Sequence, residues 1–157
     1  MIHRVLLMRH ARAGDAPRDE DRRLTREGRE DAVRVAAALA VRGGGAFRVY
    51  ASPLARASET ATLLVRETGW GPVTIEPDLA SGAALESLLM FLRSRRHAAV
   101  AIVGHMPEIG QLAGYLAWGE RSRVLPLSPG DAVHLTVTVA GESVRGTLDF
   151  HLTPPGL

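Results

Sequence analysis

The chain of 157 residues contains no cysteine and no lysine, and only 4% of it is aromatic. Without cysteine it cannot be a disulfide scaffold, use a catalytic thiol or bind a metal through thiolates. Few aromatic residues argue against a stacking platform for single-stranded nucleic acid. All 19 basic side chains are arginine, whose permanent charge holds the sequence pI at about 9.9. The formal net charge of +2 is too small to indicate a nucleic-acid partner.

Long hydrophobic runs are also missing. The run at residues 5–8 is too short for the apolar region of a signal peptide, and no run approaches the ~18 residues of a membrane-spanning helix. We therefore expect a soluble, cytoplasmic protein without a membrane partner. Hydrophobic residues make up 46% and charged residues 23%, which is typical of a globular chain. The length predicts one domain over residues 1–157.

The hydrophobic pattern predicts strands that alternate with helices. Strands are expected at residues 2–8, 47–51, 73–76, 98–103, 132–139 and 144–151. Four helices are expected between the first five strands. They begin after Thr25, at Pro53 with Ser52 as its N-cap, near residue 85 and at Pro107. Residues 153–157 are expected to fray. This order predicts an α/β fold, a three-layer α/β/α sandwich whose central sheet is mostly parallel with an antiparallel C-terminal portion.

Arginine and histidine follow three of the predicted strands. Arg9 and His10 follow the first strand, Arg56 lies one turn into the helix after the second, and His105 follows the strand at 98–103. Ligands of open α/β sheets bind beyond the carboxyl ends of the strands, so we expect these four side chains to converge. Neighbouring strand residues point to opposite faces, so the chain must leave strand geometry for Arg9 and His10 to share one site.

These four side chains suit a phosphoryl group. The forked guanidinium groups of Arg9 and Arg56, together with helix N-termini, would bind phosphoryl oxygens without a metal ion. Nearby arginines lower the pKa of a histidine, so one neutral imidazole can attack phosphorus while the other, if protonated, stabilises the transferred group.

Metal binding by His10 and His105 is the alternative use of these histidines. No HxxxH pair or carboxylate-spaced cluster supports it, and we expect no metal and no cofactor. The other histidines have no motif around them and are expected to be structural or at the surface: His3, His97, His134 and His151.

Three segments resemble motifs of the histidine phosphatase superfamily, whose fold is called phosphoglycerate mutase-like. LLMRHARAG resembles its RHG motif, ASPLARASETA its S-P-x-x-R-A-x-x-T-A motif and VGHMPEIGQL its G-H-x-P motif. RRLTREG is similar to the R-x-L-T-x-x-G segment of SixA-type phosphohistidine phosphatases, and the short chain fits that compact branch. Ala11 stands where the RHG motif has glycine. The resemblance implies that His10 is the nucleophile and that Arg9, Arg56 and His105 form the phosphate pocket.

The acidic residue that many superfamily members carry after the third strand is missing. The corresponding stretch reads DLASGAALES, in which Glu86 is the nearest carboxylate and is expected to be a solvated helix residue. Four other carboxylates lie in the loop after His10 and are expected to be surface charges: Asp15, Asp19, Glu20 and Asp21. An alkoxide leaving group needs a positioned acid, whereas the imidazole of phosphohistidine needs it far less. This difference favours phosphohistidine as the substrate.

Two alternatives stay open. The enzyme could act on small phosphomonoesters instead, or the chain could be a non-catalytic phosphate-binding domain. The presence of all four site residues argues against the second alternative. The resemblance suggests a histidine phosphotransfer domain of two-component signalling as the phosphorylated partner, and the residues themselves do not indicate an oligomeric state.

Overall fold

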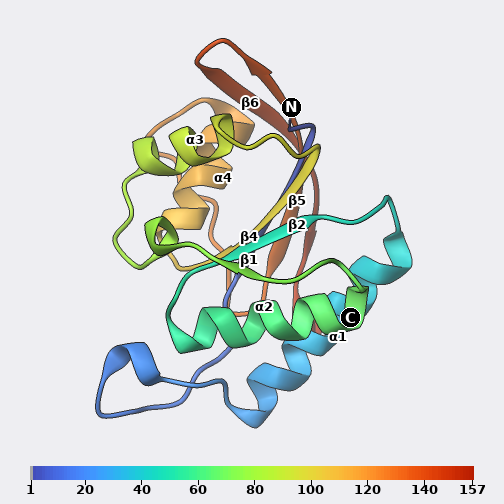
Figure 1. Ribbon diagram of the computed structural model, residues 1–157, viewed down its shortest axis with the longest axis vertical. Coiled ribbons are helices and arrows are strands. Elements are labelled where there is room, and N and C mark those ends of the chain that lie inside the picture. Colours follow the sequence, from blue (N-terminus) through green and yellow to red (C-terminus); the bar gives the residue numbers. More distant parts are fainter. Residues whose placement is uncertain (1) are drawn as a thin grey trace.

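The computed structural model describes residues 2–157 and contains the predicted alternation of strands and helices (Figure 1). The strands are β1 (Arg4–Arg9), β2 (Arg48–Ala51), β3 (Thr74–Ile75), β4 (Ala99–Gly104), β5 (Ala132–Ala140) and β6 (Ser143–Leu152). The helices are α1 (Arg26–Arg42), α2 (Ala55–Thr68), α3 (Leu85–Arg93) and α4 (Glu108–Trp118), and the short 3-10 helices are η1 (Asp19–Asp21), η2 (Pro77–Leu79) and η3 (Pro154–Gly156). Each predicted strand is present, with ends shifted by at most two residues.

These strands form one sheet in the order β3-β2-β4-β1-β5-β6. The first four strands of the chain run parallel to one another, whereas β5 pairs antiparallel with both β1 and β6. The predicted mostly parallel sheet with an antiparallel C-terminal portion is thereby confirmed. Because β1, β2 and β4 are parallel neighbours, the residues that follow them meet at one edge of the sheet.

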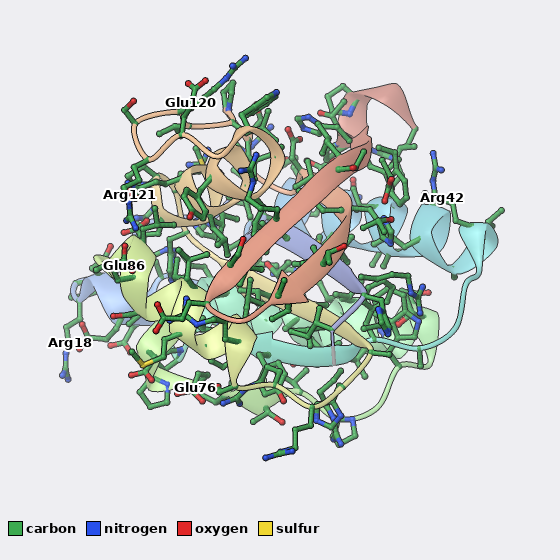
Figure 2. The ribbon with its side chains drawn as sticks, turned by 90° about the horizontal axis from the view of Figure 1, so that it is seen from above. Arg18, Arg42, Glu76, Glu86, Glu120 and Arg121 are labelled. Atoms are coloured by element: carbon green, nitrogen blue, oxygen red, sulfur yellow. The ribbon has the colours of Figure 1, made fainter. Side chains whose placement is uncertain are left out.

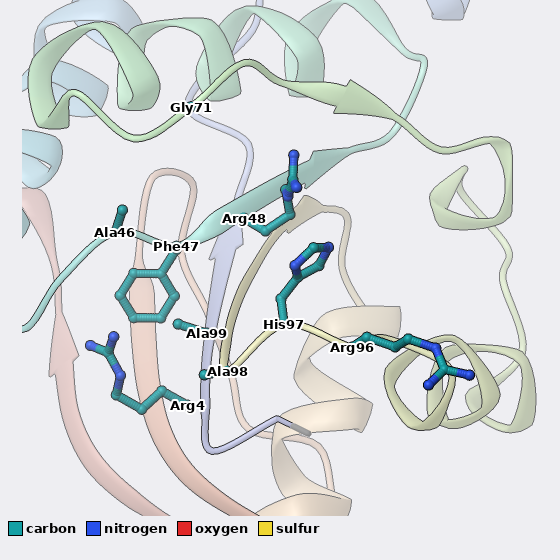
Figure 3. A pocket seen from close by; sticks show the side chains of 9 residues that line it. All are labelled: Arg4, Ala46, Phe47, Arg48, Gly71, Arg96, His97, Ala98 and Ala99. Atoms are coloured by element: carbon teal, nitrogen blue, oxygen red, sulfur yellow. The ribbon is translucent and has the colours of Figure 1, made fainter.

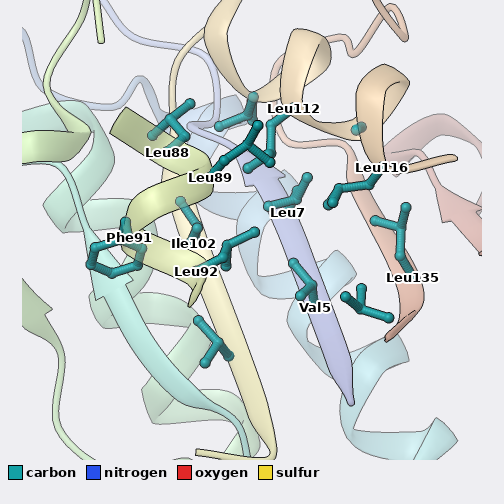
Figure 4. Packing of buried hydrophobic residues seen from close by; sticks show 14 of the residues in the cluster. Val5, Leu7, Leu88, Leu89, Phe91, Leu92, Ile102, Leu112, Leu116 and Leu135 are labelled. Carbon is teal, nitrogen blue, oxygen red and sulfur yellow. The ribbon is translucent and has the colours of Figure 1, made fainter. Parts of the chain in front are cut away.

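Helices cover both faces of the sheet and give three layers (Figure 1). Alternate residues of each strand face opposite layers, so Val5 and Leu7 of β1 pack with α3 and α4 while Leu6 and Met8 pack with α1 and α2. Figure 4 shows the first of these layers, in which Leu89 and Leu112 lie over the strands. Burial on both faces explains why β1 and β4 are continuous apolar runs in the sequence.

The helix ends agree with the sequence only in part. Thr25 caps α1 as predicted, since its hydroxyl oxygen accepts a hydrogen bond from the main-chain N–H of Gly28 at 3.0 Å. The prediction that Ser52-Pro53 begins α2 is wrong, because Leu54 is the N-cap and the helix begins at Ala55. Ser52 is instead part of the candidate site described below.

Two further expectations about the chain are corrected. Pro107 is the N-cap of α4 rather than its first residue. The tail is not frayed, because Pro154–Gly156 form η3, which contacts α1 and buries Pro154. None of the helices within residues 2–157 has the length and apolar character that crossing a membrane requires.

Candidate active site

Two strand ends place His10 beside His105. β1 ends at Arg9, which is in register with Gly104 at the end of β4. The main-chain N–H of His10 donates to the carbonyl oxygen of Gly104 at 3.0 Å, and the strand stops at this point. The ring centroids of His10 and His105 are 5.3 Å apart, with the rings tilted by 56°. The structure therefore brings together the two histidines that follow neighbouring strands.

His10 uses one ring nitrogen to fix its orientation and leaves the other for reaction. Nδ1 lies 2.8 Å from the carbonyl oxygen of Ala11, and because a carbonyl only accepts, Nδ1 carries the proton of the neutral ring. The lone pair is then on Nε2. Burial lowers the pKa of His10 to about 4, although the hydrogen bond with Ala11 opposes this effect; the charges of His105, Arg56 and Arg9 lower the pKa further. At neutral pH His10 is therefore an uncharged imidazole, which is the nucleophilic form.

Ser52 holds the second histidine. His105 is only 3% exposed, and its Nε2 lies 2.8 Å from Oγ of Ser52. Oγ also accepts a hydrogen bond from the main-chain N–H of Leu54 at 3.2 Å, which fixes the hydroxyl group between β2 and α2. Burial, and then the charge of Arg56, lowers the pKa of His105 to about 4, although Asp19 opposes this effect. His105 is therefore also neutral in the protein without substrate.

The two arginines are anchored by main-chain oxygens. Nη1 of Arg9 donates to the carbonyl oxygen of Leu127 at 2.8 Å, and Nη1 of Arg56 donates to that of Asp19 at 2.9 Å. Arg56 is 5% exposed, and Nε of Arg9 is buried without a hydrogen-bond partner among residues 2–157. A guanidinium group has five N–H donors, so both arginines keep donors for a phosphoryl group.

Thr60 connects the loop after β1 to α2 and is not among the predicted site residues. Its hydroxyl oxygen accepts a hydrogen bond from the main-chain N–H of Ala11 at 3.0 Å, and its O–H donates to the carbonyl oxygen of Arg56 at 2.7 Å. The side chain is fully buried. Thr60 is the threonine of the ASPLARASETA segment, and this buried hydroxyl ties the main chain beside His10 to that of Arg56. The motif gave the only sequence signal for it.

The RRLTREG segment closes the base of the loop that follows His10. The main-chain N–H groups of Thr25 and Gly14 donate to the carbonyl oxygens of Arg12 and Arg23, each at 2.9 Å. A Cβ atom on Gly28 would overlap the carbonyl oxygen of Arg12, so this close approach of α1 to the loop requires glycine. The loop returns to the site and brings η1 into contact with α2 (Figure 1).

Asp19 in η1 contacts the candidate site, which differs from the expectation that it is only a surface charge. Nη2 of Arg56 donates to Oδ2 of Asp19 at 3.1 Å, and Nη1 of Arg22 donates to Oδ1 at 3.3 Å. The hydrogen bonds from Arg56 and then Arg22 hold the pKa of Asp19 below its ordinary value. Asp19 is therefore an ionised carboxylate at the edge of the site.

The other acidic candidates are surface residues, as predicted. Glu20 and Asp21 form ion pairs with Arg18, and Asp15 is exposed. Glu86 is also exposed and pairs with Arg121, beside which Figure 2 shows it.

The remaining histidines lie outside the site. His134 and His151 contact the carboxylates of Asp149 and Asp131, each at 2.8 Å, and His3 is exposed. His97 lines a cavity of about 500 Å³ at the opposite end of the sheet, and none of the four predicted site residues lines this cavity (Figure 3). Within residues 2–157, no three His, Cys, Asp or Glu side chains are grouped as a metal site would require.

Comparison with known proteins assigns the chain to a family. The model of the histidine phosphatase superfamily (branch 1) matches residues 5–84, slightly more than half of the chain. The chain therefore belongs to the histidine phosphatase superfamily. The matched segment includes Arg9, His10 and Arg56, and His105 lies beyond it. No curated protein sequence gives a significant match.

Solved structures share the fold over the whole chain. The protein histidine phosphatase SixA complexed with tungstate is 24% identical, with a TM-score of 0.87 and coverage of 98% of each chain. An Agrobacterium tumefaciens protein named as a candidate phosphohistidine phosphatase SixA is also 24% identical, with a TM-score of 0.83 and coverage of 98% of this chain and 99% of that one. A mycobacterial glucosyl-3-phosphoglycerate phosphatase with VO3 is 17% identical, with a TM-score of 0.70 and coverage of 94% and 98%. The phosphoglycerate mutase-like fold is thereby confirmed.

Proposed function

We propose that the protein is a metal-independent phosphatase that dephosphorylates protein phosphohistidine through a covalent phosphohistidine on His10. The observation that carries this proposal is the state of His10, an uncharged imidazole whose Nδ1 is bound by Ala11 and whose ring lies beside His105. Arg9 and Arg56 supply the positive charge that a metal ion supplies in other phosphatases. Membership of the histidine phosphatase superfamily supports the reaction class.

In the first step, the lone pair on Nε2 of His10 forms a bond to phosphorus as the bond from phosphorus to the leaving group breaks. The electron pair of the broken bond departs with the leaving group. Arg9 and Arg56 donate hydrogen bonds to the phosphoryl oxygens and stabilise the charge that develops on them. The hydrogen bond from Nδ1–H of His10 to the carbonyl oxygen of Ala11 persists during this step. The phosphorylated ring is therefore a cation, and Ala11 accepts a hydrogen bond from its Nδ1–H.

A bound phosphoryl group changes the charge of His105. Without it, burial and Arg56 keep the pKa of His105 at about 4. A dianion beside the ring opposes the effect of the arginines and favours the protonated form, which then donates to a phosphoryl oxygen. Ser52 keeps the ring in place during this change.

In the second step, water attacks the phosphorus of phosphorylated His10. The bond from phosphorus to Nε2 breaks and its electron pair returns to the ring, while the proton from water passes to solvent. Inorganic phosphate leaves and the neutral imidazole is restored. The same arginines that stabilise the first transfer stabilise the second, since both pass through similar charge on the phosphoryl oxygens.

The carboxylates around the site support the proposed substrate. Asp19 is the carboxylate that touches Arg56, and its lowered pKa makes it a poor proton donor at neutral pH. Phosphohistidine needs little help from an acid, because its ring can be protonated from solvent before the bond breaks. A phosphorylated histidine phosphotransfer domain is the partner that we propose, and the likeness of the fold to SixA supports it.

Covalent labelling tests the nucleophile. Incubation with a phosphohistidine protein carrying labelled phosphate should transfer label to the wild-type chain, and the label should be stable to alkali and labile to acid. His10→Ala should take up no label and show no turnover above the blank, because the proposed intermediate forms on His10. Substantial turnover by His10→Ala would overturn the assignment, and absence of label in the wild type would favour the non-catalytic alternative.

A substrate comparison tests the specificity. Turnover of a phosphohistidine protein should exceed that of sugar phosphates by orders of magnitude in kcat/KM, persist in excess chelator and fall with vanadate. A preference for a sugar phosphate would favour the small-molecule alternative. Loss of activity in chelator that a divalent cation restores would contradict the metal-independent mechanism.

A further inference from the structure

Asp19 accepts one hydrogen bond from each terminal nitrogen of Arg56. Nη1 of Arg56 donates to the main-chain oxygen of Asp19 at 2.9 Å and Nη2 donates to its carboxylate oxygen at 3.1 Å. A carboxylate and a main-chain oxygen therefore bind the guanidinium group that faces the candidate phosphate pocket. Among residues 2–157, Asp19 is the only residue whose carboxylate forms a hydrogen bond with Arg9, His10, Arg56 or His105.

Hydrogen bonds within the loop fix the position of this carboxylate. Arg22 binds the second carboxylate oxygen of Asp19 at 3.3 Å and also donates through Nε to the carbonyl oxygen of Gly14 at 2.8 Å. Arg56 is 7% exposed at its side chain, whereas that of Asp19 is 63% exposed. The carboxylate thus binds a buried cation from the solvent side, which is also the side from which a substrate must enter.

An ionised carboxylate at this place has two effects on a substrate. It repels the dianionic phosphoryl group of any substrate and competes with it for Arg56. It also attracts a leaving group that carries positive charge. A phosphomonoester meets only the repulsion, because its leaving oxygen carries no positive charge, whereas a phosphohistidine with a protonated ring meets both effects.

We propose that Asp19 is a specificity-determining residue, which favours phosphoryl groups on a cationic leaving group, such as a protonated phosphohistidine ring, over phosphomonoesters. This inference rests on the proposed function and names the feature that selects its substrate class. Asp19 acts by charge and transfers no proton.

The proton balance of the step agrees with this role. The substrate ring carries its phosphoryl group on one nitrogen and a proton on the other. Nε2 of His10 bonds to phosphorus, the substrate nitrogen takes back the electron pair of the broken bond, and the ring departs as neutral imidazole with its proton still attached. Asp19 stabilises the protonated substrate that reacts, and therefore acts on kcat/KM.

The test compares Asp19→Asn with wild type on a phosphohistidine peptide and on p-nitrophenyl phosphate. Asparagine keeps an oxygen that can accept from Arg56 but removes the charge. We expect the ratio of kcat/KM for the phosphohistidine peptide to that for p-nitrophenyl phosphate to fall about tenfold, since one charge at close range is removed. The inhibition constant of vanadate should fall as well, because its competitor for Arg56 has lost its charge.

Glu20→Gln is the matched control, since Glu20 is the next carboxylate of η1 and pairs with Arg18 rather than with Arg56. It should leave both the ratio and the vanadate constant unchanged. An equal loss on both substrates in Asp19→Asn would show a merely structural role. A loss on an alkyl phosphate larger than the loss on the phosphohistidine peptide would show a general acid, because an alkoxide needs a proton to leave. Either result overturns the proposal. If the wild type does not hydrolyse phosphohistidine, both the proposed function and the leaving-group preference are wrong. The vanadate measurement then still decides whether Asp19 competes with anions for Arg56.

Discussion

Oγ of Ser52 lies 2.8 Å from Nε2 of His105, and this contact joins the end of β2 to the end of β4. Both residues are buried. A serine followed by proline is a frequent helix start, yet here the hydroxyl group holds a histidine ring. The orientation of His105 therefore depends on a residue from a neighbouring strand.

Ser52→Ala should reduce kcat about tenfold, because the His105 ring would lose the one side-chain hydrogen bond that it makes among residues 2–157, and its proposed contact with the phosphoryl group would be misplaced. Steady-state kinetics on a phosphohistidine peptide measures this loss. Ser58→Ala is the control, since that hydroxyl group binds the main chain within α2. An unchanged kcat in Ser52→Ala would show that the contact is not needed for catalysis.

Arg56→Ala should lower kcat/KM by about 10²–10³-fold while the fold survives, because the proposed role of the guanidinium group is to bind the phosphoryl oxygens and not to pack in the apolar core. Circular dichroism should match the wild type. Arg26→Ala, which removes an exposed arginine paired with Glu30, should retain full activity. Collapse of the dichroism signal in Arg56→Ala would instead identify Arg56 as a structural residue.

The two histidines should make the stability of the protein depend on pH. His10 and His105 have a pKa of about 4 in the folded protein, against 6.5 for an ordinary histidine. The unfolded chain therefore binds more protons between these values, so the free energy of unfolding falls as the pH falls from about 6.5 to about 4. Urea unfolding of wild type and His10→Asn at pH 7 and pH 4 measures this. The wild type should lose more stability than the variant, and equal losses would contradict the lowered pKa of His10.

The architecture could be predicted from the sequence because the hydrophobic pattern of each strand and helix is local and is repeated along the chain. The apolar runs of β1 and β4 and the helical spacing of α1–α4 each arise from burial of one element, and no long-range information is needed to recognise them. The four site residues were predicted together because parallel strands place their carboxyl ends at one edge.

What the sequence missed depends on contacts between distant segments. Ser52 meets His105 across 53 positions, and Asp19 meets Arg56 across 37. The distance along the sequence between the two residues of each pair does not indicate that they are in contact. Asp19 in particular lies among charged loop residues, and its approach to the site depends on contacts that close the loop, such as those of Thr25 and Gly28 with Arg12.

The proposed mechanism needs no general acid from the protein, and this leads to the last prediction. Glu86→Gln should leave phosphohistidine hydrolysis within a few fold of wild type, because Glu86 pairs with Arg121 at the surface. Asp15→Asn, Glu20→Gln and Asp21→Asn should behave alike. Hydrolysis of alkyl phosphates should already be slow in the wild type, since an alkoxide leaves poorly without a proton whereas a protonated imidazole leaves readily. A loss of about 100-fold or more on phosphohistidine in one of these variants would be in the range of a true general acid and would contradict the proposed mechanism.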